Sequence, residues 1–308
     1  MASKLRLSVS PHIHTHETVQ SIMLDVIIAL LPATLAGVII FGLRSLAVIA
    51  VCIIASVLSE FIFNKIVKKD QSIGDLSAIV TGLLLALNLP ANVPLWQAAI
   101  GSIFAIVVVK CFFGGMGCNL VNPAITARVF MLVAFGSMAT AAFPVDSTAS
   151  ATPLVGMAEG TNTLSLTQLF LGNHGGAIGE TCALALLIGG IYLIIRRVIT
   201  WHIPVAFIGT VFLFSLCLEG FDVMAALQWI LGGGLFIGAF FMATDYVTSP
   251  ETSSGKIIAG VFCGVITVMI RFWGNYPEGV SFAILLMNIM DPYIGAWTAK
   301  KVFGGEDR

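Results

Sequence analysis

Apolar residues in this sequence gather into long runs that are separated by short polar intervals. A helix needs about 20 apolar residues to cross the hydrocarbon core of a bilayer, so each run is predicted to form a transmembrane segment. The pattern therefore predicts an all-α integral membrane protein that contacts lipid along much of its length. About ten segments are expected, over residues 22–42, 45–63, 75–89, 95–113, 120–141, 181–199, 203–219, 225–244, 256–273 and 279–298.

The composition supports this class. Of the 308 residues, 58% are hydrophobic and 10% are charged, whereas about 25% of the residues of a soluble domain are charged. The formal net charge is −1, so no nucleic acid is expected as a partner. The six cysteines lie mostly in or beside apolar runs without C-x-x-C spacing, which argues against disulfides and against a metal site.

The distribution of Lys and Arg predicts the orientation. With a cytoplasmic N-terminus, thirteen of the 15 basic residues fall on the cytoplasmic side, and the other two, Arg44 and Arg271, fall outside. Such a bias is typical of membrane proteins. Both termini are therefore expected in the cytoplasm, and residues 142–180, which contain no Lys or Arg, outside it. The thirteen are Lys4, Arg6, Lys65, Lys68, Lys69, Lys110, Arg128, Arg196, Arg197, Lys256, Lys300, Lys301 and Arg308.

The chain also repeats itself. Three pairs of positions, each about 160 residues apart, share one layout: Pro90 with Pro250, Lys110 with Arg271, and Gly114 with Gly274. Two halves of five spans each are expected, and an odd number of spans inverts the second half in the membrane. The expected parts are a cytoplasmic arm (1–21), a first repeat (22–141), an extracytoplasmic loop (142–180), a second repeat (181–299) and a cytoplasmic tail (300–308).

Prolines interrupt several of these segments. Proline removes a backbone donor, and the freed carbonyl needs a protein or water partner inside a membrane. Asn122-Pro123 and Asp291-Pro292 occupy comparable places in the two halves, and the third segment stops early at Pro90. The sequence therefore predicts broken or re-entrant helices.

Four polar residues adjoin these breaks and are expensive to place in a membrane. They are Asn119, Asn122, Asp245 and Asp291. Two interpretations stay open: they line an ion path or surround a flavin ring, or they only join helices. Lys110 and Arg128 are interpreted differently, as side chains that extend to the lipid headgroups.

A polar stretch of small residues, from Asp146 to Leu154, stands out in this apolar chain. Pro153 follows Thr152, which favours an extended backbone and an accessible hydroxyl at Thr152. The spacing from Asp146 to the pair Ala151-Thr152 resembles the acceptor motif Asp-x-x-Ser/Thr-Gly-Ala-Thr, with Ala149 and Ser150 in place of its Ser/Thr and Gly.

Two further stretches, GGMGCNLVNPA at 114–124 and FMATDYVTSP at 241–250, resemble segments of one membrane protein family, and so does Ser10-Pro11-His12. The family comprises the RnfD-type membrane proteins of the Rnf complex and their relatives in the sodium-translocating NADH:quinone oxidoreductase. The resemblance covers nearly the whole chain. It implies a fold similar to that of urea transporters, in the inner membrane of a bacterial or archaeal cell.

The resemblance also implies a role. A flavin transferase would join FMN covalently to Thr152, with Asp146, Ser150, Ala151 and Pro153 forming the rest of the acceptor site. Riboflavin would be a possible second, non-covalent cofactor. The partners would be other Rnf subunits, one of them with its own covalent FMN, and the transported ion would be Na⁺ or H⁺.

The residues themselves show no nucleotide-binding glycine loop and no catalytic triad, so no catalytic residues are expected in this chain on its own. Its task would be to hold a cofactor and tune its surroundings. Two alternatives remain: a urea-transporter-like solute channel without a redox role, and the quinone-reducing relative of the Rnf protein. A channel has no use for the exposed threonine motif.

Overall fold

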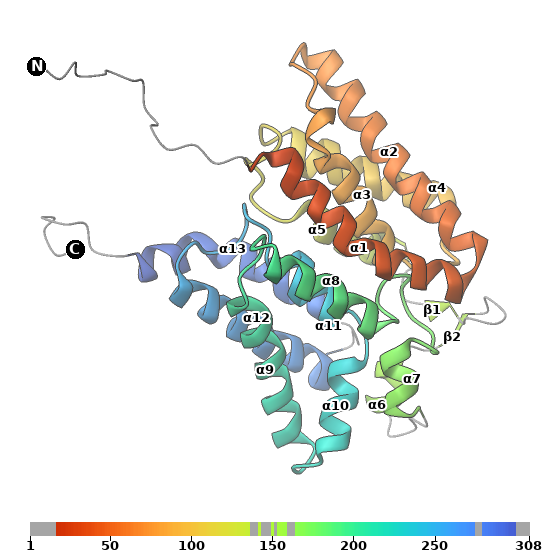
Figure 1. The fold of residues 1–308 in the computed structure, drawn as a ribbon, viewed down its shortest axis with the longest axis vertical. Helices are drawn as coiled ribbons and strands as arrows, with labels where there is room; N and C mark the ends of the chain where they lie inside the picture. The colour runs from red at the N-terminus through yellow and green to blue at the C-terminus, as the bar shows by residue number, and fades with distance from the viewer. Residues whose placement is uncertain are drawn as a thin grey trace, which may run out of the picture.

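The computed structural model describes residues 17–135, 141–142, 149–150, 153–158, 164–274 and 279–299. They form a helical protein, with two-residue strands β1 and β2 paired antiparallel (Figure 1). The elements are α1 (Val19–Phe41), α2 (Leu43–Val67), η1 (Ile73–Asp75), α3 (Ser77–Leu87), α4 (Leu95–Ile103), η2 (Phe104–Cys111), α5 (Pro123–Ala134), β1 (Ala141–Ala142), β2 (Ala149–Ser150), α6 (Pro153–Ala158), α7 (Leu166–Leu171), α8 (Ala183–Ile195), α9 (His202–Leu218), α10 (Val223–Leu231), α11 (Leu235–Ile237), η4 (Gly238–Met242), α12 (Ser253–Trp273) and α13 (Val280–Thr298).

Helices begin and end where the sequence supplies caps. Thr18 and Ser21 form a capping box at the start of α1, so the first free N–H groups of that helix have partners. Gly42, with a φ of +74°, makes the sharp turn between α1 and α2. Asn122 caps α5, and its side chain accepts hydrogen bonds from two backbone N–H groups of the first turn.

Among the described residues, four helices are long and apolar enough to cross a membrane: α1, α2, α12 and α13. A fifth span is possible if α10 is counted with α11 and η4, which continue it after a bend of 66°. This confirms the prediction of a helical, multi-pass membrane protein. Every predicted segment contains a helix, but α3, α5 and α8 have only 11, 12 and 13 residues.

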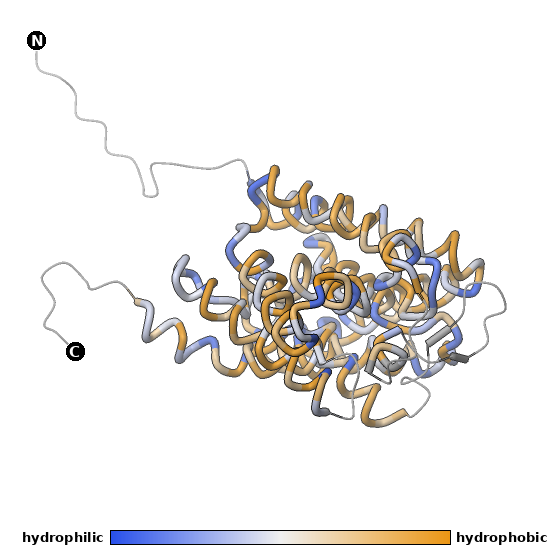
Figure 2. The backbone as a smooth tube through the Cα atoms, turned by 90° about the horizontal axis from the view of Figure 1, so that it is seen from below, coloured by the Kyte–Doolittle hydropathy of each residue, from blue (hydrophilic) through white to orange (hydrophobic). Residues whose placement is uncertain are grey.

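The surface of the helices is apolar, as contact with lipid requires. Ile39 and Leu43, at the turn between α1 and α2, are 82% and 80% exposed. Figure 2 shows hydrophobic residues along most of the backbone tube, on outward as well as inward helices. Polar side chains such as Glu60, Lys110 and Asn122 are instead buried inside. This distribution is the reverse of that in a soluble protein.

The two halves of the chain pack against each other through α1 and α8. The contact is a close approach of backbones, because a Cβ atom added at Gly189 of α8 would lie 2.1 Å from the carbonyl oxygen of Ala29 in α1. Small residues allow such contacts between helices in membranes. Within the halves, α2 packs on α3 and α4, and α9 packs on α10 and α12.

The third predicted segment is short, and the structure shows what completes it. The stretch before α8 lies buried beside the end of α3, where the N–H of Gly179 donates to the carbonyl of Leu87 at 2.7 Å and the N–H of Ile178 donates to that of Leu89 at 3.0 Å. The interrupted helix therefore receives its missing donors from the second half of the chain.

The contact between α1 and α8 generates a prediction. Gly189→Ala places a methyl group against the Ala29 carbonyl and should lower the free energy of unfolding by about 1 to 3 kcal/mol. Thermal unfolding of the detergent-solubilised protein measures the loss. The matched control is Gly209→Ala in α9, where an added Cβ meets nothing within 4 Å. Equal unfolding temperatures for the two variants would contradict this packing.

Candidate functional site

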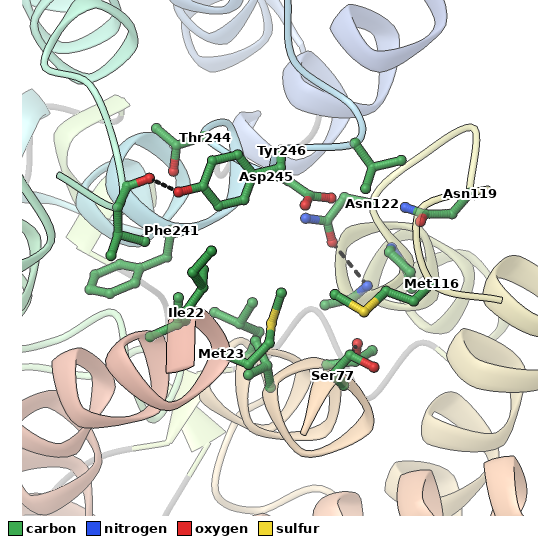
Figure 3. A pocket seen from close by; sticks show the side chains of 18 of the residues that line it. Ile22, Met23, Ser77, Met116, Asn119, Asn122, Phe241, Thr244, Asp245 and Tyr246 are labelled. Atoms are coloured by element: carbon green, nitrogen blue, oxygen red, sulfur yellow. Dashed lines mark hydrogen bonds between the residues drawn. The ribbon is translucent and has the colours of Figure 1, made fainter. Parts of the chain in front are cut away.

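A cavity of about 150 Å³ lies where the interrupted helices meet. Side chains from α1, α3, η2, the end of η4 and the glycine-rich loop before α5 form its walls. Figure 3 shows Ile22, Met23 and Phe241 on one side of this cavity, and Asn119, Asn122 and Asp245 on another. The cavity therefore combines an apolar wall with a polar edge, as sites for small molecules commonly do.

Asn122 holds the polar edge in place. Its side-chain oxygen accepts hydrogen bonds from the N–H groups of Ala124 at 3.0 Å and Ile125 at 3.3 Å. Its amide nitrogen donates to the carbonyl of Met242 at 3.4 Å, which joins the start of α5 to the end of η4. The side chain of Asn119 donates to the carbonyl of Val121 at 3.1 Å.

Asp245 lies in the turn that follows η4. Burial raises the pKa of its carboxyl group, and the hydroxyl of Thr248 donates to one of its oxygens at 3.3 Å. The cavity therefore contains a carboxyl group that holds its proton more tightly than a carboxyl group in water. The structure thus brings three of the four polar residues singled out by the sequence, Asn119, Asn122 and Asp245, to one cavity.

The fourth, Asp291, lines a neighbouring cavity of about 580 Å³ between α13 and the start of α12. Tyr246 and Val247 belong to the walls of both cavities. Asp291 is partly buried, and its Oδ1 atom has no hydrogen-bond partner among the described residues. A second carboxylate, that of Glu251, lines the same cavity.

Asn288, one turn before Asp291, connects the two regions and was not found from the sequence. With its amide oriented by its surroundings, it accepts a hydrogen bond from the N–H of Asn122 at 2.9 Å and donates to the carbonyl of Thr248 at 3.1 Å. Nothing distinguishes Asn288 in the sequence from other polar residues of apolar segments. Its partners Asn122 and Thr248 lie 40 or more residues away, and only the fold identifies them.

The structure corrects the interpretation of Lys110 and Arg128 as side chains that extend to lipid headgroups. Both are buried, 3% and 4% exposed, and each forms an ion pair inside the protein. Lys110 Nζ lies 2.9 Å from a carboxylate oxygen of Glu60, and Arg128 Nη2 lies 3.4 Å from one of Glu180. The interpretation was wrong because buried cations need anionic partners, and these two partners are distant in sequence.

Lys110 also belongs to the wall of the first cavity, together with Ser77. Its Nζ atom lies 2.6 Å from the hydroxyl of Ser77 at the start of α3. No pattern in the sequence predicts this arrangement, since Glu60, Ser77 and Lys110 come from three different segments.

The acceptor stretch predicted for flavin lies mostly outside the described residues, which exclude Asp146, Ala151 and Thr152. Ser150 belongs to β2, and Pro153 is the buried first residue of α6. The structure therefore describes the residues on either side of the Ala151-Thr152 pair, but not that pair.

Leu154, two residues after Thr152, anchors α6 to the rest of the protein. It is 1% exposed, and a Cβ atom added at Gly233, in the break between α10 and α11, would lie 2.6 Å from its side chain. Gly233 has a φ of +71°, which also favours glycine. The Thr152 stretch is thus followed at once by a helix seated on the break between α10 and α11.

Comparison with known proteins identifies the family of this chain. Residues 6–304 match the model of the NQR2, RnfD, RnfE family. The chain is 47% identical to the D subunit of the Na⁺-translocating ferredoxin:NAD⁺ oxidoreductase complex of Acetobacterium woodii, over 97% of this chain and 95% of the relative. It is 41% identical to the D subunit of the proton-translocating ferredoxin:NAD⁺ oxidoreductase complex of Clostridium ljungdahlii, over 97% and 96%. It is 36% identical to the D subunit of the ion-translocating oxidoreductase complex of Marinobacter nauticus, over 96% and 94%. These matches confirm the resemblance seen in the sequence, and the chain belongs to the NQR2, RnfD, RnfE family.

Proposed function

We propose that this chain is the membrane-embedded RnfD component of an Rnf-type, ion-translocating ferredoxin:NAD⁺ oxidoreductase, acting with the other subunits of that complex. The observation that carries the proposal is its similarity to the D subunits of two such complexes, along almost the full length of each chain. It favours a redox role over a solute channel. One of these relatives is named for Na⁺ and another for protons, so both ions remain open.

Within this complex, the chain carries FMN joined covalently to Thr152 by a flavin transferase, and passes electrons near the outer membrane face. The acceptor motif between Asp146 and Pro153 supports this assignment. The close approach of Leu154 to Gly233 also supports the assignment. It fixes α6, and a fixed α6 limits how far a flavin on Thr152 can move. FMN supplies the electron-carrying chemistry, and the polypeptide positions it.

The first cavity is the proposed site of a non-covalent riboflavin. Apolar side chains such as Met23 and Phe241 suit the faces of a flat ring system, and Asn119 and Asn122 offer amide groups for its polar edge. Asp245 also lines this cavity. These donor and acceptor groups fit the edge of a flavin ring, which itself contains carbonyl and N–H groups.

The ten segments form, in our proposal, two inverted repeats of five. The charged residues support this pairing. In the first half, Glu60 of α2 pairs with Lys110 of η2. About 160 residues later, Glu219 after α9 accepts a hydrogen bond from Trp229 at 2.8 Å, and Arg271 of α12 donates to the carbonyl of Trp229.

The membrane orientation proposed from the sequence has structural support. Figure 1 shows the start of α1 and the end of α13 on one side of the molecule, and β1, β2 and α6 on the opposite side. This arrangement fits cytoplasmic termini and an extracytoplasmic Thr152 stretch in a bacterial or archaeal inner membrane.

The coupled ion is proposed to pass near Asp291. Its cavity contains two carboxylates, Asp291 and Glu251, and one oxygen of Asp291 has no hydrogen-bond partner in the described part of the chain. Carboxylates inside membrane proteins commonly mark ion or proton routes.

The orientation predicts reporter activities. A fusion after Lys69 or Arg197 should be active only with a cytoplasmic reporter, and a fusion near Gly160 only with an extracytoplasmic one. Paired phosphatase and fluorescent-protein reporters measure both compartments. A cytoplasmic signal from the fusion near Gly160 would place Thr152 on the wrong side for this proposal.

Covalent attachment predicts a flavin signal that survives denaturation. Protein made in cells with the transferase should fluoresce in an SDS gel, and its mass should exceed the sequence mass by one FMN less water. Thr152→Val should remove both signals, because it deletes the hydroxyl and keeps the side-chain shape. Thr148→Val is the control and should keep them. Loss of flavin from the control alone would move the attachment site.

The ion route predicts that Asp291→Asn lowers ion uptake while the complex still assembles. Substrate-driven uptake of ²²Na⁺ or of protons into vesicles, and the amount of assembled complex, are measured on the same preparation. Asp70→Asn, at an exposed loop residue, is the control. Normal uptake by the Asp291 variant in normally assembled complex would exclude this carboxylate from the route.

A further inference from the structure

A continuous chain of hydrogen bonds leads from the loop after α2 to the wall of the first cavity. The hydroxyl of Ser77 donates to Asp75 Oδ1 at 2.5 Å and accepts from Lys110 Nζ at 2.6 Å. Lys110 donates in turn to the two oxygens of Glu60 at 3.0 and 2.9 Å. The hydroxyl of Ser72 donates to Glu60 at 2.6 Å.

The chain has one accessible end and one enclosed end. Asp75 and Ser72 lie in the loop between α2 and α3 and are only partly buried. Ser77, Lys110 and Glu60 are buried, at 6%, 3% and 1% exposure. Ser77 and Lys110 also line the cavity, where Figure 3 shows Ser77 on the same side as Met23.

Stability alone does not account for this arrangement. A buried ion pair contributes little net free energy, because the desolvation of both charges offsets their attraction. Here the pair is flanked on each side by a serine hydroxyl, a group that accepts and donates protons at the same atom. Such a sequence of groups is suited to move a proton.

The charged groups around Lys110 set its environment. Glu60 faces it from α2, and Asp75 faces it from η1 through Ser77. Asp245 lines the same cavity from the turn after η4. Lys69, another cation of the loop after α2, donates instead to the carbonyl of Gly114 at 3.3 Å. Lys110 is therefore held at the cavity wall between two carboxylates.

We propose that Asp75, Ser77 and Lys110 form a proton relay that protonates the flavin ring in the first cavity when that ring is reduced. The inference rests on the proposed riboflavin site. The electron comes from the redox chain of the complex. An N–H bond of the Lys110 ammonium breaks as an N–H bond forms on a ring nitrogen.

The relay then restores Lys110. Asp75, which accepts from the Ser77 hydroxyl as a carboxylate, first takes a proton from hydronium in solution. The neutral Lys110 amine then takes the Ser77 hydroxyl proton while the Ser77 oxygen takes the proton of Asp75, so that Asp75 is a carboxylate again. Each group ends in its starting state, and one proton has entered for one electron. Glu60 acts as a positioning residue, because its two hydrogen bonds fix the Lys110 amine.

Ser77→Ala tests the relay, because it deletes the link to Asp75 and leaves the ion pair between Lys110 and Glu60. The purified complex is reduced with dithionite in a stopped-flow instrument. Absorbance follows the non-covalent flavin, and a pH indicator follows proton uptake. Both rates should fall at least about tenfold in this variant. The midpoint potential of the flavin should stay unchanged, since a relay alters the rate and not the equilibrium.

Further variants separate a relay from a structural effect. Ser77→Thr keeps the hydroxyl and should restore both rates, and the wild type should react more slowly in D₂O while Ser77→Ala loses that isotope effect. Lys69→Met is the control for removal of a lysine and should behave like the wild type. Lys110→Met, which also removes the donor, should slow proton uptake at least as much as Ser77→Ala.

Each outcome decides the inference. Unchanged rates in Ser77→Ala with its flavin bound would overturn the relay and leave the riboflavin site intact. Equal slowing by Lys69→Met would show a general charge effect and also overturn it. Absence of any acid-extractable flavin from the wild-type complex would overturn the riboflavin proposal, and the relay with it.

Discussion

The structure depends on one constraint: a backbone group that lacks a helical partner inside the membrane must find one elsewhere in the protein. The end of α3 shows how this is met. Two carbonyl groups, those of Leu87 and Leu89, accept hydrogen bonds from Gly179 and Ile178, which lie just before α8. The first half of the chain is therefore completed by the second, and the contact of α1 with α8 holds the two halves in register.

The same constraint places the polar residues. Asn122 satisfies the first turn of α5 and the carbonyl of Met242, and Asn288 satisfies the N–H of Asn122. Breaks in helices leave backbone groups without helical partners, and side-chain amides can supply those partners. The cavity with Asn119, Asn122 and Asp245 is a consequence of these breaks. Polar side chains thus reach this cavity because the helices are interrupted there.

The sequence predicted much of this fold because a bilayer imposes a simple rule on composition. Long apolar runs identified the helices, and Pro90 predicted the early end of α3. The sequence also marked Asn122 and Asp245, since polar residues beside prolines and glycines are conspicuous in an apolar chain. It did not predict which helices cross completely, because α5 and α8 have only 12 and 13 residues within the longer segments predicted at 120–141 and 181–199.

The buried ion pairs were missed for a different reason. Glu60 and Lys110 stand 50 residues apart, each near the end of an apolar run, where charged residues usually meet water. Arg128 and Glu180 are likewise separated, and Glu180 falls in a stretch predicted to be an outer loop. Nothing local distinguishes a charge at the membrane surface from one paired across helices. The pairing is therefore a property of tertiary structure. The proposed attachment residue, Thr152, lies outside the part of the chain that the structure describes.

The two halves of the chain differ at Lys110 and Arg271, the positions that the proposed repeat makes comparable. Lys110 carries an ammonium group, which can give up a proton, and it contacts a carboxylate and a hydroxyl. Arg271 carries a guanidinium group, which stays protonated, and it donates to the carbonyl groups of Trp229 and Gly232 at the break on which Leu154 is seated. If both regions hold flavins, as proposed, the half with the lysine can couple reduction to proton transfer, whereas the half with the arginine provides a constant positive charge. The flavin proposed for Thr152 would bring the negative charge of its phosphodiester, and Leu154, two residues later, lies against Gly233 beside Arg271. A constant positive charge therefore suits this region. In our proposal, this difference in one basic residue gives the two repeats different electrochemical roles.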